Sequence, residues 1–182
     1  MTLWDEIATD ANRGAERLIA EYGDRLYNSA VRLCGNEAEA EDLVFRTFSQ
    51  VIAHIRSFSA QSAFYTWIYS IMLNFRRMDM RKKGSNALEF PKELPEVADL
   101  ANGPEEIASL NDDIAEVRKA IASLDESYRE VVVMYYFDDM EVADISIALG
   151  IPLGSVKSRL HRARRILFRK LQRTNPSDAA SK

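Results

Sequence analysis

The sequence predicts an all-α protein of two small helical domains joined by an acidic flexible linker. Apolar residues recur at helical spacing along most of the chain, Gly and Pro gather in one acidic stretch, and basic residues concentrate on either side of that stretch. We expect a first domain over residues 1–83, the linker over 84–110, a helix-turn-helix domain over 111–173 and a disordered tail over 174–182.

Three amphipathic helices account for the first domain. Apolar residues at intervals of three and four form one helix face from Leu18 to Leu33. A second helix follows the Gly35-Asn36 pair, and its acidic first turn suits the positive end of the helix dipole. A third helix carries apolar residues from Phe64 to Met78. Three helices of this size can close one small core.

The distribution of charge indicates contacts with a polyanion, although the net charge is −4. The linker is strongly acidic and contains three of the chain's five Pro residues. In contrast, residues 76–83 are mainly basic, and residues 151–173 contain eight Lys and Arg residues and no acidic residue. Two basic segments flanking an acidic spacer are typical of two nucleic-acid contacts, whereas a single charge run is as often a solvated helix face.

Several classes of protein are disfavoured by composition. The chain has one cysteine, Cys34, and two distant histidines, His54 and His161, so we expect no metal site and no cofactor. It has no glycine-rich phosphate loop and no combination of residues suited to nucleophilic catalysis, so we expect no enzyme activity. No apolar stretch is long enough to cross a bilayer and the N-terminus does not resemble a signal peptide, which predicts a cytoplasmic protein. Cys34 is either a buried apolar residue or a redox sensor.

The second domain contains a helix-turn-helix pattern. The run Val131–Phe137 also fits a buried strand, but its neighbours on both sides favour a helix. A short helix over Glu141–Leu149 ends at the turn Gly150–Pro152, and a longer basic helix follows, from about Leu153 to Leu171. A helix, a turn containing Gly and a longer basic helix is the arrangement that places a recognition helix in the DNA major groove.

The basic helix separates its residues by face. One face is an apolar stripe that must pack on the rest of the domain. The other face carries the candidates for major-groove contact, which are Lys157, Ser158, His161, Arg162 and Arg165, with Ser155 near the helix start. Arg162 can bond guanine through two donors, whereas Arg159, Arg164 and Arg169 lie toward the flanks and suit phosphate. The alternative to DNA binding is that this basic helix binds a protein or simply faces water.

Aromatic residues precede the first basic segment, and two interpretations of them remain open. They are Phe58, Phe64, Tyr65, Trp67 and Tyr69. Aromatic rings close to positive charge suit single-stranded nucleic acid, because bases stack on the rings. The other interpretation is that the rings belong to the hydrophobic core, as aromatic residues at helical spacing more often do.

Three segments resemble RNA polymerase sigma factors of the extracytoplasmic-function group. They are AEAEDLVFRTF (Ala38–Phe48), SAFYTWIYSIMLN (Ser62–Asn74) and the stretch Ser123–Arg164, which contains GIPLGSVKSRLHRAR. The resemblance implies sigma domain 2, a linker and sigma domain 4, with core RNA polymerase, promoter DNA and an anti-sigma factor as partners and with no membrane insertion.

The resemblance also implies roles for individual residues. The residues that it implies bind core polymerase are Asp42, Leu43, Thr47 and Phe48. Those that it implies recognise the minus-ten promoter element are Phe58, Phe64, Trp67, Asn74, Arg76 and Arg77. Those that it implies recognise the minus-thirty-five element are Ser155, Lys157, Ser158, Arg159, His161, Arg162 and Arg165.

One departure from the family pattern lies in the core-binding segment. Phe45 and Arg46 stand where the family usually has Gln-Glu, and this exchange is expected to alter the contact with polymerase. It leaves open a sigma mimic that sequesters an anti-sigma factor. A stand-alone helix-turn-helix regulator is the other alternative, although the first 110 residues lack the alternating strands of a receiver domain.

Overall fold

The computed structural model describes residues 2–84 and 114–174. The first range contains α1 (Leu3–Thr9), α2 (Ala11–Cys34), α3 (Glu37–His54), the 3-10 turn η1 (Ile55–Ser57) and α4 (Phe64–Lys82). The second contains a helix over residues 114–122, α6 (Glu126–Tyr136), α7 (Val142–Leu149) and α8 (Leu153–Thr174). Every regular element in these two ranges is helical, which confirms the predicted all-α class.

The helices begin and end where local signals place them. Gly35 adopts the left-handed conformation, with φ of 70°, and ends α2 by donating its N–H to the Val31 carbonyl at 2.7 Å. Asn36 then caps α3, because its side-chain oxygen accepts the Glu39 N–H at 3.1 Å. The ambiguous run Val131–Phe137 lies in α6 and its C-terminal cap, so the helical interpretation is confirmed.

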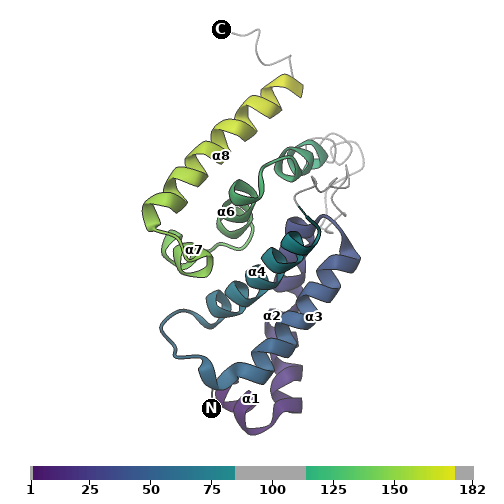
Figure 1. The fold of residues 1–182 in the computed structure, drawn as a ribbon, viewed down its shortest axis with the longest axis vertical. Coiled ribbons are helices and arrows are strands. Elements are labelled where there is room, and N and C mark those ends of the chain that lie inside the picture. Colours follow the sequence, from purple (N-terminus) through teal and green to yellow (C-terminus); the bar gives the residue numbers. More distant parts are fainter. Residues whose placement is uncertain (1, 85–113, 175–182) are drawn as a thin grey trace, which may run out of the picture.

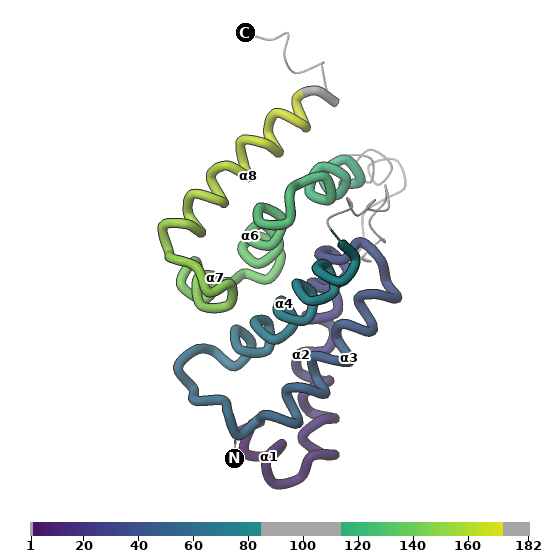
Figure 2. Tube along the Cα trace, in the orientation of Figure 1, coloured from purple at the N-terminus to yellow at the C-terminus, as the bar shows by residue number. Residues whose placement is uncertain are grey.

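Figures 1 and 2 show the helices in two halves, α1–α4 at the N-terminal end and the 114–122 helix with α6–α8 at the other. The halves meet where α7 lies against α4 and α6 lies against α2. One continuous cluster of buried apolar side chains includes residues from both halves. Helices of the two halves therefore share a core.

This second layer over α4 changes which of its residues are buried. The predicted apolar face runs as far as Met78, but Met78 is 46 % exposed. Tyr69, Met72 and Leu73 are fully buried instead. The reason is that α4 is covered by α3 on one side and by α7 on another, so its buried surface is wider than a single stripe.

The predicted linker (84–110) and tail (174–182) lie outside the described residues, apart from Gly84 and Thr174. Among the helices that the two ranges contain, none has the length and apolar character that a membrane span requires.

Candidate nucleic-acid interface

The turn between α7 and α8 is held by hydrogen bonds on both sides. Gly150 has a left-handed backbone, with φ of 65°, which ends α7. The Ser146 hydroxyl donates to the Ile151 carbonyl at 2.6 Å, and the Pro152 carbonyl accepts the Ser155 N–H at 2.8 Å. The two helices therefore leave this turn at a fixed angle, as a helix-turn-helix requires.

One face of α8 packs into the domain. Val156, Leu160 and Ala163 are almost fully buried, and Leu167 is partly buried against the same cluster that contains Ala163. Because this stripe fixes the rotation of α8 about its axis, it also decides which residues point outward.

The outward face of α8 carries the predicted recognition residues. Those that are exposed are Lys157, Ser158, His161, Arg162 and Arg165. Ser155 and Arg159 are half-buried, and Arg159 lies close enough to Glu130 to influence its titration. The structure thus gathers the predicted minus-thirty-five residues along one side of α8.

The aromatic residues form one cluster at the start of α4. The Phe58 and Phe64 ring centroids are 5.0 Å apart, and Trp67 lies 5.3 Å from Phe58 and 5.8 Å from Phe64. Phe64 is buried, whereas Phe58 and Trp67 are half-buried. The cluster therefore has a core side and a surface side, so neither interpretation of it is eliminated.

The aromatic residues predicted from the sequence omit two rings that contact this cluster, Tyr22 and Trp4. Tyr22 lies 5.8 Å from Phe64, and Trp4 lies 5.3 Å from Phe58 and 5.7 Å from Phe64, centroid to centroid. Trp4 belongs to α1, which is only seven residues long and therefore too short to show a helical repeat of apolar residues. A signal was available in Thr2 and Asp5, which have the spacing of a capping box.

The predicted minus-ten residues farther along α4 have different surroundings. Asn74 is exposed. Arg76 is only 4 % exposed, donates to the Leu33 carbonyl and pairs with Glu126 at 2.6 Å. In this arrangement Arg76 joins the two halves, and DNA could reach it only after they separate.

Arg77 makes a second ion pair across the same contact. Its guanidinium lies 3.6 Å from the Glu130 carboxylate. Burial raises the pKa of Glu130, and the charge of Arg77 opposes that increase. Arg77 itself is half-buried, so part of its side chain faces solvent.

Asp138 is the most enclosed acidic group at the contact between the halves. Its side chain is 2 % exposed, accepts a hydrogen bond from the Tyr69 hydroxyl at 3.0 Å and accepts another from the Ser29 hydroxyl. Burial raises the pKa of Asp138 to about 6, although the bonds from Ser29 and Tyr69 lower it in part. Nearby, the Thr66 hydroxyl donates to Asp144 of α7 at 3.0 Å.

The residues predicted to bind polymerase divide into surface and interior positions. Asp42 is exposed on α3. Leu43, Thr47 and Phe48 are buried, and the Thr47 hydroxyl donates to the Leu43 carbonyl at 2.7 Å. Within the described arrangement these three support α3 from the inside, and Asp42 is the one of the four that a partner can touch.

The unusual pair Phe45-Arg46 has two distinct roles. The Arg46 guanidinium bonds Asp79 of α4 at 3.2 Å and lies 2.8 Å from Asp42. The hydrogen bond that Arg46 donates to Asp79 raises the pKa of Arg46 more than any other contact. Phe45, by contrast, is 72 % exposed. Arg46 therefore ties α3 to α4, and Phe45 is the residue of the pair that changes the outer surface of α3.

Cys34 has the surroundings of a structural thiol. It is partly exposed and unpaired, and burial raises its pKa to about 11. A thiol with so high a pKa is protonated at neutral pH and reacts slowly. This favours the buried apolar role over that of a redox sensor.

Comparisons with known proteins agree with this geometry. Residues 18–86 match the family Sigma-70 region 2, and residues 114–167 match Sigma-70, region 4. The chain is 32 % identical over 162 residues to the ECF RNA polymerase sigma factor SigW of Bacillus subtilis, covering 83 % of this chain and 85 % of that protein. It is 30 % identical to the ECF RNA polymerase sigma factor SigE of Mycolicibacterium smegmatis, covering 92 % of this chain and 61 % of that protein.

A solved structure has a similar fold. The sigma factor RpoE of Bartonella quintana, crystallised with the anti-sigma factor NepR, superposes with a TM-score of 0.67 at 26 % identity, covering 86 % of this chain and 96 % of that one. Region 2 matches the half that carries the aromatic cluster, and region 4 matches the half that carries the helix-turn-helix. The chain belongs to the extracytoplasmic-function (ECF) RNA polymerase sigma factors.

Proposed function

We propose that this protein binds core RNA polymerase and directs it to promoters of a stress-type regulon that have minus-ten and minus-thirty-five elements. The observation that carries the proposal is the exposed basic face of α8, which lies within the region that matches Sigma-70 region 4. The polymerase supplies the chemistry, and this chain supplies promoter specificity without a catalytic residue or a cofactor. Its place of action is the cytoplasm.

The recognition chemistry differs along α8. Arg162 is exposed near the centre of the outward face and can donate two hydrogen bonds to one guanine. Arg164 is also exposed, but it lies toward the flank and suits a phosphate. The two residues therefore form a matched pair, in which the first reads sequence and the second adds affinity.

Transcription in vitro tests the proposal. Core polymerase is combined with the protein on fragmented genomic DNA, and the start sites are sequenced. Start sites that share two motifs at fixed spacing, and that are absent without the protein, support the proposed function. An absence of such sites with folded protein would contradict it and would favour the sigma mimic, in which the exposed Phe45 prevents polymerase binding.

The proposed regulatory partner is an anti-sigma factor. Support comes from the similar Bartonella sigma factor, whose structure was solved in complex with one. We expect the target promoter to be silent in unstressed cells and to become active when the partner is removed. Constitutive activity of that promoter in unstressed cells would contradict this part of the proposal.

A further inference from the structure

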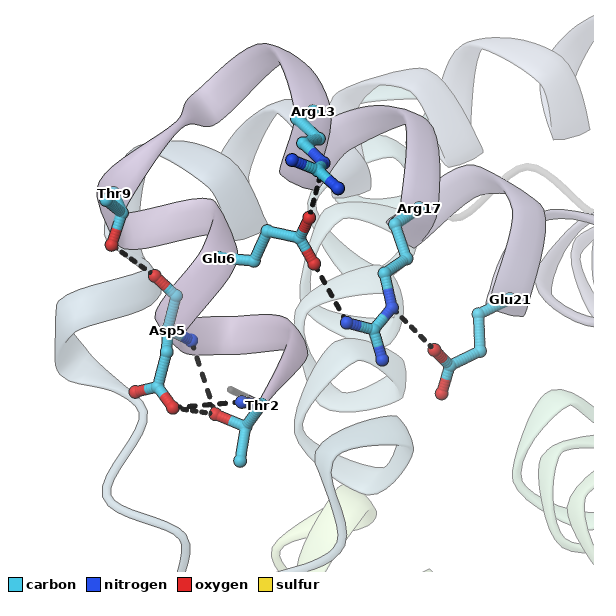
Figure 3. Close-up of polar contacts among 7 residues, drawn as sticks. All are labelled: Thr2, Asp5, Glu6, Thr9, Arg13, Arg17 and Glu21. Atoms are coloured by element: carbon cyan, nitrogen blue, oxygen red, sulfur yellow. Dashed lines mark hydrogen bonds and ion pairs between the residues drawn. The ribbon is translucent and has the colours of Figure 1, made fainter.

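The short helix α1 is docked firmly on α2. Glu6 is buried, and its two carboxylate oxygens pair with Arg13 at 3.0 Å and with Arg17 at 2.8 Å (Figure 3). Arg17 also lies 3.8 Å from Glu21, one turn farther along α2. The carboxylate of Glu6 thus fixes one side of α1 against two successive turns of α2.

Backbone contact fixes the crossing of the two helices. A Cβ atom placed on Gly14 would lie 2.5 Å from the Ile7 Cα atom, so only glycine allows α1 and α2 to approach this closely. Asp10 lies between the helices and caps α2 by accepting the N–H groups of Asn12 and Arg13 at 3.1 and 3.2 Å. Helix α1 is therefore held at both its side and its end.

From this position α1 brings Trp4 to the loop between η1 and α4. Phe58 and Phe64 lie at the two ends of that loop, and the Trp4 ring contacts both of them. Between them the loop exposes residues 59–61, and Ala60 has a positive φ of 55°. A residue other than glycine rarely adopts this conformation, so its surroundings must maintain it.

We propose that Trp4 is a positioning residue for capture of the minus-ten strand, an inference that rests on the proposed function. By contacting Phe58 and Phe64 together, Trp4 holds the 58–64 loop in one conformation before DNA arrives. A loop ordered in advance loses less conformational freedom on binding, and its affinity is correspondingly higher. Trp4 itself need not touch the DNA.

The Sigma-70 region 2 match begins at residue 18, so α1 lies before it. Trp4 therefore lies outside the matched region, whereas Phe58 and Phe64, the two rings that it contacts, lie inside it. The proposed role also gives a reason for the ion pairs of Glu6 and the close crossing at Gly14, since both determine where Trp4 lies.

Three variants test the role of Trp4. Trp4→Ala removes the ring, Trp4→Phe keeps an aromatic ring at the same place, and Ile19→Ala removes an apolar side chain on α2 that is 56 % exposed. Each is assembled with core polymerase, and anisotropy measures its affinity for the non-template minus-ten strand of a promoter found by start-site mapping. Affinity for core polymerase and for the duplex minus-thirty-five element is measured in parallel.

We expect Trp4→Ala to bind the minus-ten strand about tenfold more weakly, since two aromatic contacts are lost. Affinity for polymerase and for the minus-thirty-five duplex should stay unchanged, Trp4→Phe should recover most of the loss, and Ile19→Ala should match the unmodified protein. An equal loss of all three affinities would indicate general destabilisation and would overturn the proposal. Unchanged or tighter strand binding would overturn it as well.

A second measurement does not depend on a promoter. The rate of hydrogen exchange of the loop amides is compared between the unmodified protein and the Trp4→Ala variant, both without polymerase and DNA. We expect faster exchange over residues 58–63 in the variant and unchanged exchange in α8. If the loop amides exchange at the same rate in both, Trp4 does not order the loop, whatever the transcription assay shows. If no promoter is found, the proposed function fails and this second result still decides the role of Trp4 in ordering the loop.

Discussion

The burial of Asp138 predicts that acid favours the closed arrangement of the two halves. Its pKa is about 6 when the halves are together, compared with 3.8 for an ordinary aspartate. Because the closed arrangement binds this proton more strongly, it gains stability as the pH falls through about 6, and that gain is fully present below 3.8. At pH 7.5 almost no gain remains, whereas at pH 5 the closed arrangement is favoured about tenfold.

The charged and titratable groups around Asp138 do not cancel this response. Arg25 and Arg32 of α2 lower its pKa. Burial raises the pKa values of Tyr65 and Tyr69 of α4, so both phenols remain protonated. Asp138 is therefore the group in this cluster that changes charge between pH 7.5 and 5.

Energy transfer between two dyes measures the response. In a Cys34→Ser background, Ser49→Cys on α3 and Ser158→Cys on α8 supply exposed labelling sites, one in each half. We expect transfer to rise from pH 7.5 to pH 5 with Asp138 present. Asp138→Asn keeps one acceptor oxygen for the two hydroxyls of Ser29 and Tyr69 and cannot titrate, so its transfer should change much less with pH. The change that remains is expected from Glu130, whose pKa burial also raises. The same pH response in both proteins, or separation of the halves in acid, would refute the reasoning.

Three further predictions concern single contacts. Arg46→Ala should lower the free energy of unfolding by about 1 kcal/mol in urea, because it breaks a partly exposed pair with Asp79, and Asp79→Ala in the same background should then cost little more. Gly14→Ala should cost about 1–3 kcal/mol, measured by thermal unfolding, because its new methyl group would overlap the Ile7 backbone; an unchanged melting temperature would contradict that crossing. Arg162→Ala should lose about 1–3 kcal/mol of discrimination at one or two promoter positions, and uniform weakening over all sequences would instead indicate a phosphate contact, the role proposed for Arg164.

Features that depend on local pattern could be predicted from the sequence. The buried stripe of α8, with Val156 and Leu160, repeats at helical spacing, and its opposite face is therefore known without a structure. The end of α7 at Gly150 follows from local chemistry in the same way. For this reason the outward positions of Lys157 and Arg162 agree with the prediction.

Features that depend on contacts between distant residues could not be predicted. The bond between Tyr69 and Asp138 joins positions 69 residues apart, and no periodicity indicates it. Arg76 likewise looked like a surface cation in a basic run, yet its partners are Leu33 and Glu126. A hydrophilic residue at a contact between helices has the same sequence signature as one in water, so pattern alone cannot distinguish them.

Because the two halves share an apolar core, the free energy of separating them depends on temperature. The buried cluster that contains Tyr69 and Leu73 of α4 also contains Met140 and Ile145 of the other half. Separation of the halves exposes such apolar groups to water, and this exposure increases the heat capacity. The hydrophobic attraction between the halves therefore weakens on cooling, and the open population should grow in the cold without any change in the exposed face of α8.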